Sequence, residues 1–312
     1  MMTEEFQVKC VVVRRSKSFP GFLWQQLRIL LFLIKNISAS EVVYCWFADY
    51  HSFLPVWFAH IWHRKSFLVT GGYDTVYLPE LSYGVFSNPL RSLMVSYAIR
   101  HATCNLPVSV FLAGELCHRF GKDLRFKVVP TGYDPNQFIP SDKKPIVLTV
   151  IGADTEKRMI IKGADRFISL ARIMPEIKFV LIGLSTRLIE KLQAPKNVVI
   201  TDFLDEEEVK QWMSISKVYV QLSLREGLPN AVLEAMLCEC AVLGINHSGL
   251  AEAVGEQGIL LEQWECNQAK SEVNKLLHDT GLGPRARQRV VKFFSPEMRK
   301  TALTSLISQS YS

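Results

Sequence analysis

Short apolar runs alternate with longer amphipathic segments along nearly the whole chain. Runs rich in β-branched and aromatic residues predict strands, and apolar residues spaced three and four apart predict helices. The predicted strands are 8–13, 41–47, 66–70, 102–106, 126–129, 146–151, 178–182, 197–201, 217–222, 241–245 and 258–261. The predicted helices are one from Gly21 onward and those at 54–62, 89–101, 108–120, 164–174, 186–192, 206–213, 231–237, 267–278, 285–293 and 297–307. Such alternation is typical of α/β proteins whose mostly parallel sheets are covered on both faces.

The strand and helix pattern occurs twice. A polar stretch at 141–145 interrupts it, and a new series of strands and helices follows. A chain of 312 residues suits two domains, each large enough for its own core. We therefore expect two Rossmann-like domains that face each other across a cleft, at residues 1–140 and 141–295. We expect the helix in 296–312 to pack back toward the first domain.

The net charge and the cysteines limit which partners, compartments and metal sites the sequence suits. The formal net charge of +6 suits anionic substrates or an anionic membrane surface, but no Lys/Arg run is long enough for a nucleic-acid track. The seven cysteines are scattered without a C-x-x-C pair, which favours a reducing cytosol over a disulfide framework or a zinc site. No Asp-x-Asp occurs, so no metal ion is expected at a diphosphate.

The N-terminal region bears on location. The chain begins M-M-T-E-E-F, without the basic and apolar pattern of a signal peptide. Residues 22–37 are very apolar, but Gln25, Arg28 and Lys35 interrupt them, and the segment is too short and too polar to span a bilayer. An amphipathic helix packed on a sheet is favoured over an interfacial membrane helix. We expect a cytoplasmic protein and leave peripheral membrane contact open.

The most informative stretch is 223–237, which joins the strand at 218–222 to a helix. A helix that starts near Pro229 presents free N–H groups and a partial positive charge, which suit a phosphate. Glu226 in the loop could reach sugar hydroxyls, and Glu234 in the first turns of the helix could accept hydrogen bonds from a ribose diol. Singly, each glutamate is better read as an ordinary solvated side chain.

The segment 226–234, E-G-L-P-N-A-V-L-E, resembles the E-x7-E motif of retaining glycosyltransferases of the GT-B class, family-4 type. The resemblance implies that Glu226 faces the donor sugar and Glu234 binds the nucleotide ribose. It also implies a nucleotide-diphosphate sugar as donor substrate, no further cofactor, and a glycan or lipid-linked acceptor in surface polysaccharide or glycoconjugate synthesis. The other donor-binding residues of the motif are Gly227, Leu228, Pro229 and Asn230.

A second part of the resemblance follows the strand at 146–151. Lys162 precedes a glycine as in the family, whose lysine contacts the donor diphosphate, where charge develops as the glycosidic bond breaks. The family has an arginine just after the strand's closing glycine, and here Ala153 stands there. Arg158 could supply the missing cation from the loop, or it could be a solvated basic residue. Phe203 lies where the family's backbone contacts the nucleotide base, and Asp205 is expected to cap a helix.

The first half carries weaker candidates. Asp49 and His51 follow the second strand, where the family places a residue near the donor's anomeric carbon, so they are catalytic candidates together with Lys162 and Glu226. A structural role for His51 is equally open, whereas Asp49 is favoured because a strand-end aspartate has no obvious partner in the core. The acceptor-side candidates are Gly71, Gly72 and Asp74, and the glycines would let backbone approach a ligand closely.

Ala153 also supports an alternative function. A homologue without that cation could be catalytically weak or inactive and act as a nucleotide-sugar-binding or partner subunit. An NAD-dependent enzyme is discounted, because the first βα turn lacks a glycine fingerprint.

Overall fold

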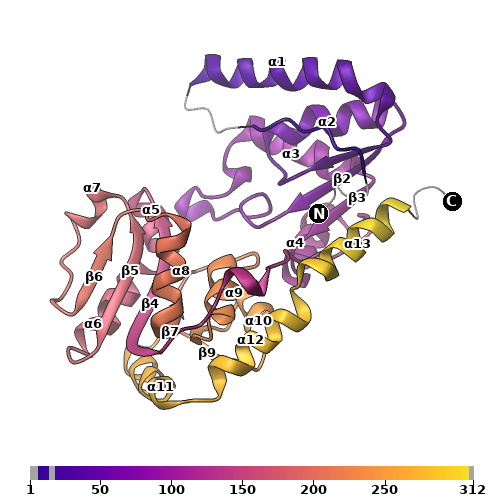
Figure 1. Cartoon of the computed structure of the whole chain (residues 1–312). Coiled ribbons are helices and arrows are strands. Elements are labelled where there is room, and N and C mark those ends of the chain that lie inside the picture. Colours follow the sequence, from indigo (N-terminus) through magenta and orange to yellow (C-terminus); the bar gives the residue numbers. More distant parts are fainter. Residues whose placement is uncertain (1–5, 14–17, 309–312) are drawn as a thin grey trace. The chain divides into compact units, whose positions relative to one another are not determined.

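A computed structural model describes residues 6–13 and 18–308 (Figure 1). The chain divides into two compact units. Unit 1 comprises Met1–Pro130 and Arg299–Ser312, and unit 2 comprises Thr131–Met298.

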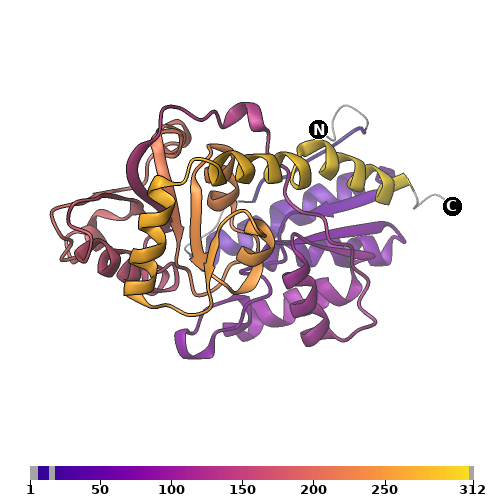
Figure 2. The same cartoon turned by 90° about the horizontal axis from the view of Figure 1, so that it is seen from below.

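Unit 1 is built on a three-stranded parallel sheet in the order β1-β2-β3. Its strands are β1 (Val42–Cys45), β2 (Lys65–Thr70) and β3 (Cys104–Pro107). Its helices are α1 (Phe19–Asn36), α2 (Tyr50–Ile61), α3 (Pro89–His101) and α4 (Val110–Phe120), with 3-10 turns at Ile37–Ala39, Pro79–Leu81 and Val85–Ser87. From Arg299 on, helix α13 (Pro296–Ser308) also belongs to this unit, and its yellow ribbon can be followed in Figure 2.

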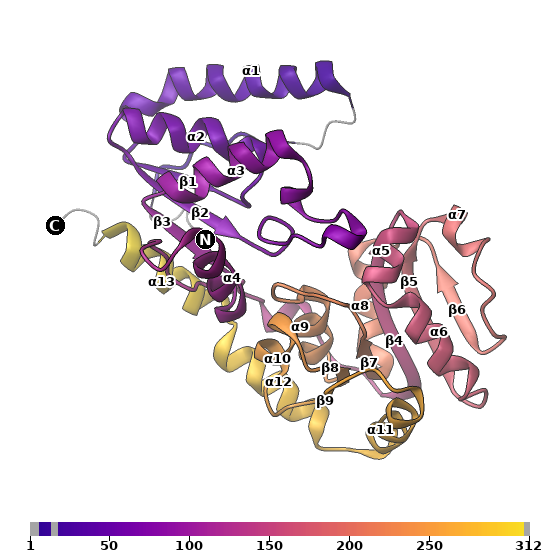
Figure 3. The ribbon, with the colours of Figure 1, turned by 180° about the vertical axis from the view of Figure 1, so that it is seen from behind.

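Helix α1 forms an outer layer of unit 1. It packs on α2, and α2 packs on β1 and β2, as Figures 1 and 3 show from opposite sides. The Tyr50 hydroxyl donates to the Gln25 amide oxygen at 3.2 Å. The prediction that this apolar helix packs on the sheet is therefore wrong. The inner position is taken by α2, whose buried face includes the small residues Ser52 and Ala59 that let a helix approach strands closely.

Two predicted strands of unit 1 are not strands. Residues 8–13 form no strand, and Val8 and Val12 are exposed, because no neighbouring strand pairs with this segment to bury its alternate side chains. Residues 126–129 run beside β3 with hydrogen bonds such as Val129 N to Pro107 O, but form only one isolated bridge, at Phe126. Pro107 has no N–H to donate, so the ladder stays incomplete.

Unit 2 has a six-stranded, all-parallel sheet in the order β6-β5-β4-β7-β8-β9. The strands are β4 (Lys144–Ala153), β5 (Lys178–Leu184), β6 (Val198–Thr201), β7 (Ser216–Gln221), β8 (Ala241–Ile245) and β9 (Ile259–Leu261). Counted within the unit, this is the order 3-2-1-4-5-6 of a Rossmann sheet. The strand order therefore reverses between β4 and β7, and ligands of such sheets bind beyond the carboxyl ends of the strands at that point.

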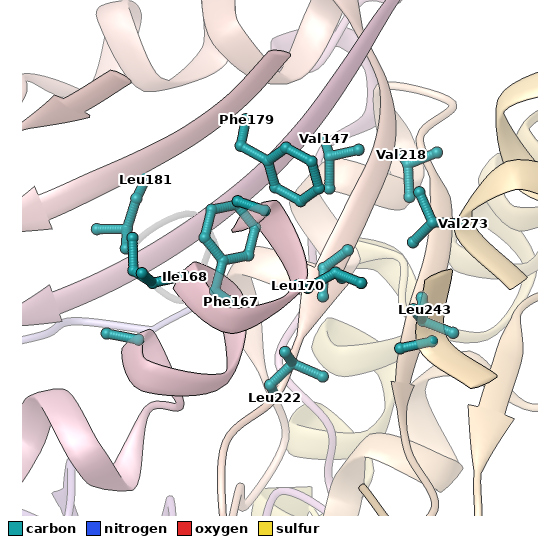
Figure 4. Packing of buried hydrophobic residues seen from close by; sticks show 14 of the residues in the cluster. Val147, Phe167, Ile168, Leu170, Phe179, Leu181, Val218, Leu222, Leu243 and Val273 are labelled. Carbon is teal, nitrogen blue, oxygen red and sulfur yellow. The ribbon is translucent and has the colours of Figure 1, made fainter. Parts of the chain in front are cut away.

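Helices cover both faces of this sheet. The helices are α5 (Glu156–Ile161), α6 (Ala164–Arg172), α7 (Thr186–Ile189), α8 (Glu206–Ile215), α9 (Asn230–Leu237), α10 (Ser248–Val254), α11 (Cys266–His278) and α12 (Leu282–Phe293), with a 3-10 turn at Pro135–Gln137. Helices α6 and α11 pack together on one face, and α8, α9 and α12 pack on the other. Figure 4 shows the first face, where the rings of Phe167 and Phe179 meet edge to face at 5.3 Å. This rigid core fixes where the loops after β4 and β7 begin.

Candidate functional site

The loops after β4 and β7 meet through an ion pair. The Lys162 ammonium lies 2.7 Å from Glu226 Oε1, and both side chains are mostly shielded from solvent. The Gln221 side-chain amide donates to the same carboxylate oxygen at 2.9 Å. Two residues 64 positions apart are thus joined at the switch point of the sheet. A cation and a carboxylate there can contact a diphosphate and sugar hydroxyls respectively.

A buried polar chain supports Glu226 from the strand side. Gln221 Nε2 also donates to Ser223 Oγ at 2.5 Å, and the Tyr219 hydroxyl donates to Gln221 Oε1 at 3.2 Å. The backbone N–H of Val150 in β4 donates to the Tyr219 oxygen at 3.2 Å. Burial raises the pKa of Tyr219, which keeps the phenol a proton donor. The Glu226 carboxylate is therefore oriented by groups anchored in β4 and β7.

The end of the β8–α10 loop and the first turn of α10 hold the backbone of Glu226. The N–H of Glu226 donates to Ser248 Oγ, and the N–H of Gly249 donates to the Glu226 carbonyl, each at 3.0 Å. Ser248 has a positive φ of 57°, an unusual conformation for serine. His247 Nδ1 lies 3.0 Å from the Ser248 oxygen, and burial lowers the pKa of His247, which favours the neutral ring. This loop fixes the position from which Glu226 projects.

Gly163 lets the loops approach each other. Its φ is +79°, and an added Cβ would lie 2.2 Å from the carbonyl oxygen of Leu222. The glycine after Lys162 is therefore required by the close passage of the β7 loop, and it fixes where the lysine side chain starts.

We expect Gly163→Ala to destabilise unit 2 by about 2 kcal/mol or more, because the substitution combines a left-handed backbone with a steric clash. Gly152→Ala is the matched control, since Gly152 has φ +61° with open space around an added Cβ. It should cost only about 1 kcal/mol. Chemical denaturation of both variants, followed by hydrogen exchange in β4 and β7, measures the difference. Equal losses would show that the contact with Leu222 is unimportant.

Glu234 lies in α9, and no other residue in the described part of the chain forms a hydrogen bond with its carboxylate. Burial raises the pKa of Glu234 to about 6, the Glu206 carboxylate adds to the rise, and Lys210 opposes it. At the start of the same helix, the Tyr133 hydroxyl donates to the Asn230 amide oxygen at 2.6 Å. Of the motif residues before it, Gly227, Leu228 and Pro229 are buried, so they shape the loop mainly through backbone. Glu234 is therefore a half-buried carboxylate whose pKa is raised.

The remaining candidates of unit 2 lie around this centre. The Arg158 guanidinium pairs with the Asp154 carboxylate at 3.6 Å, so it belongs to a different ion pair from Lys162 and Glu226. Ala153 is fully buried at the end of β4. The ring of Phe203 is exposed just beyond β6, as a stacking surface would be. Asp205 forms a capping box with Glu208, so its predicted role as a helix cap is confirmed.

The candidates of unit 1 occupy a different environment. The Arg91 guanidinium of α3 donates hydrogen bonds to both carboxylate oxygens of Asp49. It also lies 5.7 Å from the ring centre of Tyr50 and 5.6 Å from that of Tyr73. Asp49 also caps α2 by accepting from the Tyr50 N–H. His51 Nε2 lies 3.0 Å from the Trp46 carbonyl oxygen. The expectation that Asp49 lacks a partner is wrong, and its catalytic role, like that of His51, stays a prediction.

Asp74 is buried among backbone donors. Its carboxylate accepts hydrogen bonds from the N–H groups of Ala48, Gly71 and Gly72 at 2.7–3.1 Å, and burial raises its pKa. An added Cβ on Gly71 would meet the Phe47 ring at 2.1 Å. These contacts tie the loop after β2 to the segment after β1. The acceptor-side role of Gly71, Gly72 and Asp74 stays a prediction.

Sequence reasoning missed three supporting residues. Gln221 could have been found from the sequence, because it is a polar residue in an otherwise apolar strand. Ser248 and Arg91 carried none, because they reach Glu226 and Asp49 only through the tertiary fold. Within the described ranges, no group of three or more His, Cys, Asp or Glu side chains could hold a metal ion.

Comparison with known proteins points to one family. Residues 135–292 match the model described as Glycosyl transferases group 1. The chain is 24% identical over 231 residues to WcaL of Salmonella typhimurium, a protein named for colanic acid biosynthesis. The matched region covers 67% of this chain and 57% of WcaL. The chain spans about half the length of the curated relatives it matches.

Solved structures share the fold. A sucrose-phosphate synthase from Thermosynechococcus elongatus superposes with a TM-score of 0.75 at 18% identity, over 94% of this chain and 78% of the synthase. Anabaena HepE in complex with UDP-glucose superposes with a TM-score of 0.72, also at 18% identity, over 89% of this chain and 82% of HepE. At these identities the likeness establishes the fold alone.

Proposed function

Because this chain belongs to the glycosyl transferases group 1, we propose that it is a retaining glycosyltransferase that uses a nucleotide-diphosphate sugar as donor. Its fold class is GT-B, with two Rossmann-like α/β units. The observation that carries the proposal is the Lys162–Glu226 pair at the switch point of the unit 2 sheet, inside the segment that matches the family. The acceptor is a glycan or a lipid-linked glycan, which agrees with the naming of WcaL for polysaccharide synthesis.

Each residue of the unit 2 site has a proposed role. Lys162 neutralises the departing diphosphate, and the bound diphosphate competes with Glu226 for its ammonium. Glu226 then accepts hydrogen bonds from the donor sugar, held in place by Gln221 and Ser248. Glu234 binds the ribose diol, and the exposed Phe203 ring lies against the base. With the cation supplied by Lys162, transfer needs no metal ion.

The reaction relies on positioning and charge. Retention without a covalent intermediate requires the departing phosphate and the incoming hydroxyl to share one face of the sugar. The protein then contributes orientation and stabilisation of the negative charge that develops on the leaving group. Asp49 and His51 act near the reacting carbon in this proposal, and Gly71, Gly72 and Asp74 shape the acceptor side. We place the enzyme in the cytoplasm, where nucleotide sugars are supplied.

Ala153 favours a second candidate, a weak or inactive homologue that binds a nucleotide sugar or a partner subunit. The position where the family has arginine is fully buried here, and Arg158 is paired with Asp154 instead. The two functions differ in turnover, and both require nucleotide binding.

Nucleotide binding tests the site. We expect calorimetry with UDP, GDP and their sugars to identify one preferred nucleotide, and Glu234→Gln to weaken its sugar's binding roughly tenfold through lost ribose hydrogen bonds. Glu176→Gln, the same change at an exposed position beyond α6, is the matched control and should bind as wild type does. No binding of any of these ligands at millimolar concentration would contradict both functions.

The same binding should depend on pH. Glu234 can accept hydrogen bonds from both hydroxyls of a diol through its two oxygens only when it is ionised, and its pKa is about 6. Affinity for the nucleotide sugar should therefore fall about tenfold between pH 7 and pH 5. The diphosphate of a nucleotide sugar lacks the terminal phosphate proton that titrates near pH 6. Glu234→Gln should abolish this pH dependence, and its persistence would remove Glu234 from the role.

The free energy of unfolding of Glu234→Gln distinguishes a loss of ligand binding from a damaged fold. The folded state binds the Glu234 proton more tightly than the unfolded chain, so this residue costs stability as pH rises from about 4.5 through 6. Glu234→Gln should therefore raise the free energy of unfolding at pH 8, by up to about 2 kcal/mol. A less stable variant would indicate that lost binding reflects a damaged fold.

A further inference from the structure

Helix α1 is apolar on two opposite faces. Its inner face, with Ile29 and Leu33 buried, packs on α2. Residues two positions apart in a helix lie on roughly opposite sides. The large apolar residues exposed along the outside, here termed the outer stripe, are Phe19, Leu23, Trp24, Leu27, Leu31 and Ile34. A helix that is apolar all round is normally covered on all sides, so the outer stripe indicates a second apolar surface.

The charged side chains of helix α1 itself are all positive. Helix α1 contains no Asp or Glu, and its only charged residues, Arg28 and Lys35, are both exposed. Helices α2 and α3 contain no Asp or Glu either. A partner with an apolar interior and negative charges at its surface complements this face.

The end of α2 extends the exposed apolar surface. Ile61 and Trp62 are about half exposed. The Arg64 guanidinium donates to the Ser38 carbonyl at 2.8 Å, which brings the chain just after α2 beside the chain just after α1. Tryptophan is favoured where an apolar phase meets water, and Trp24 and Trp62 are both exposed here.

We propose that the outer stripe of α1 binds the surface of an anionic lipid bilayer, with the helix lying in the plane of the interface. The apolar side chains enter the acyl boundary, and Arg28 and Lys35 extend toward lipid phosphates while their stems stay in apolar surroundings. Among the described residues, no helix is both long and apolar enough to cross a bilayer. The binding needs no nucleotide and is independent of the function proposed for unit 2.

A second copy of the chain fits this face less well. A two-fold interface brings the same patch of both subunits together. Arg28 and Lys35 of one copy would then approach the cations of the other, and α1 supplies no carboxylate to pair with them.

Vesicle flotation tests the proposal with two matched pairs of variants. The wild-type chain should float with phosphatidylcholine vesicles that contain phosphatidylglycerol, and Leu27→Glu with Leu31→Glu should lower the partition coefficient at least tenfold. Ile139→Glu, at an exposed position of unit 2, should bind as wild type does. Arg28→Gln with Lys35→Gln should lower binding about fivefold for each cation. Lys122→Gln with Lys196→Gln, which removes two other exposed cations, should not.

Several outcomes would overturn the proposal. Equal flotation of wild type and the stripe variants would place the membrane contact elsewhere. A concentration-dependent dimer that the stripe variants dissociate, without vesicle binding, would assign the stripe to a second copy. A monomer that binds no vesicle would leave the stripe without a lipid partner. Because the substituted side chains are exposed, melting curves should match wild type in every variant.

Discussion

Lys162→Ala should lower the turnover of sugar transfer at least about 100-fold, with a smaller change in KM. A single group that stabilises developing charge in a desolvated site contributes about 100- to 1000-fold to turnover. The Lys162 ammonium lies in a mostly shielded position, and among the described residues its ion-pair partner is the Glu226 carboxylate, which a diphosphate can replace. Nucleotide release from the preferred nucleotide sugar, with water as the slow acceptor, measures this without knowledge of the natural acceptor.

Lys191→Ala is the matched control for that variant. Lys191 pairs with Glu156 on the surface, where both side chains are more than half exposed. Removing such a pair changes little, so turnover should stay within about twofold of wild type. Arg158→Ala belongs in the same series, because a large loss would show that Arg158 supplies the cation missing at Ala153.

The result also separates the two candidate functions. An enzyme loses turnover with Lys162, whereas a binding subunit has no turnover to lose and shows only weaker nucleotide binding. Wild-type turnover in Lys162→Ala would contradict the proposed role of the ion pair. Removal of the lysine leaves the Glu226 carboxylate without its cation, so melting curves should accompany the kinetics.

The core of unit 2 could be predicted from the sequence because each element there agrees with its surroundings. The strand at 241–245 is found at the predicted bounds, since Ala241–Ile245 is buried on both faces and bounded by turn residues. The helix that carries Glu234 ends at the predicted Leu237 and begins one residue earlier than predicted, at Asn230. A buried parallel strand leaves its mark in a continuous apolar run.

Unit 1 was less predictable because apolar runs there are not all buried by a sheet. Residues 8–13 look like a strand in composition, and Val12 is 67% exposed. Helix α1 has enough apolar residues to lie on a sheet, but α2 occupies that place. The local propensities of these two segments could not predict their final positions, because both positions depend on which segment reaches the sheet.

The site shows the same division. Glu226 and Glu234 follow from a motif, whereas Ser248, the first residue of α10, holds Glu226 from 22 positions away with an unusual serine conformation. Asp49 was expected to be unpartnered, and Arg91, 42 positions on, proves to be its partner. Long-range polar contacts of this kind have no periodicity in sequence from which to infer them.

Arg299→Ala should destabilise unit 1 by about 3 kcal/mol. Arg299 of α13 is buried, and its guanidinium donates to the carbonyls of Val129 and Pro130 at 3.0 and 2.7 Å and to the Tyr44 hydroxyl at 2.9 Å. It also stacks on the Trp46 ring at 4.8 Å. Truncation would leave buried acceptors unsatisfied, and each costs about 1–3 kcal/mol. Arg299→Lys should rescue little, because an ammonium cannot reproduce the planar fork that serves all these partners.

Met298→Ala is the control on the same helix, since the Met298 side chain is half exposed and should contribute less than about 0.5 kcal/mol. Hydrogen exchange of the β1 amides during denaturant titration reports on unit 1 separately from unit 2, which matters because two units need not unfold together. Faster exchange in β1 with unchanged exchange in β8 is the expected pattern. Equal protection of β1 in Arg299→Ala and Met298→Ala would mean that α13 is held by apolar packing, such as that of buried Leu303, and that its arginine contributes little.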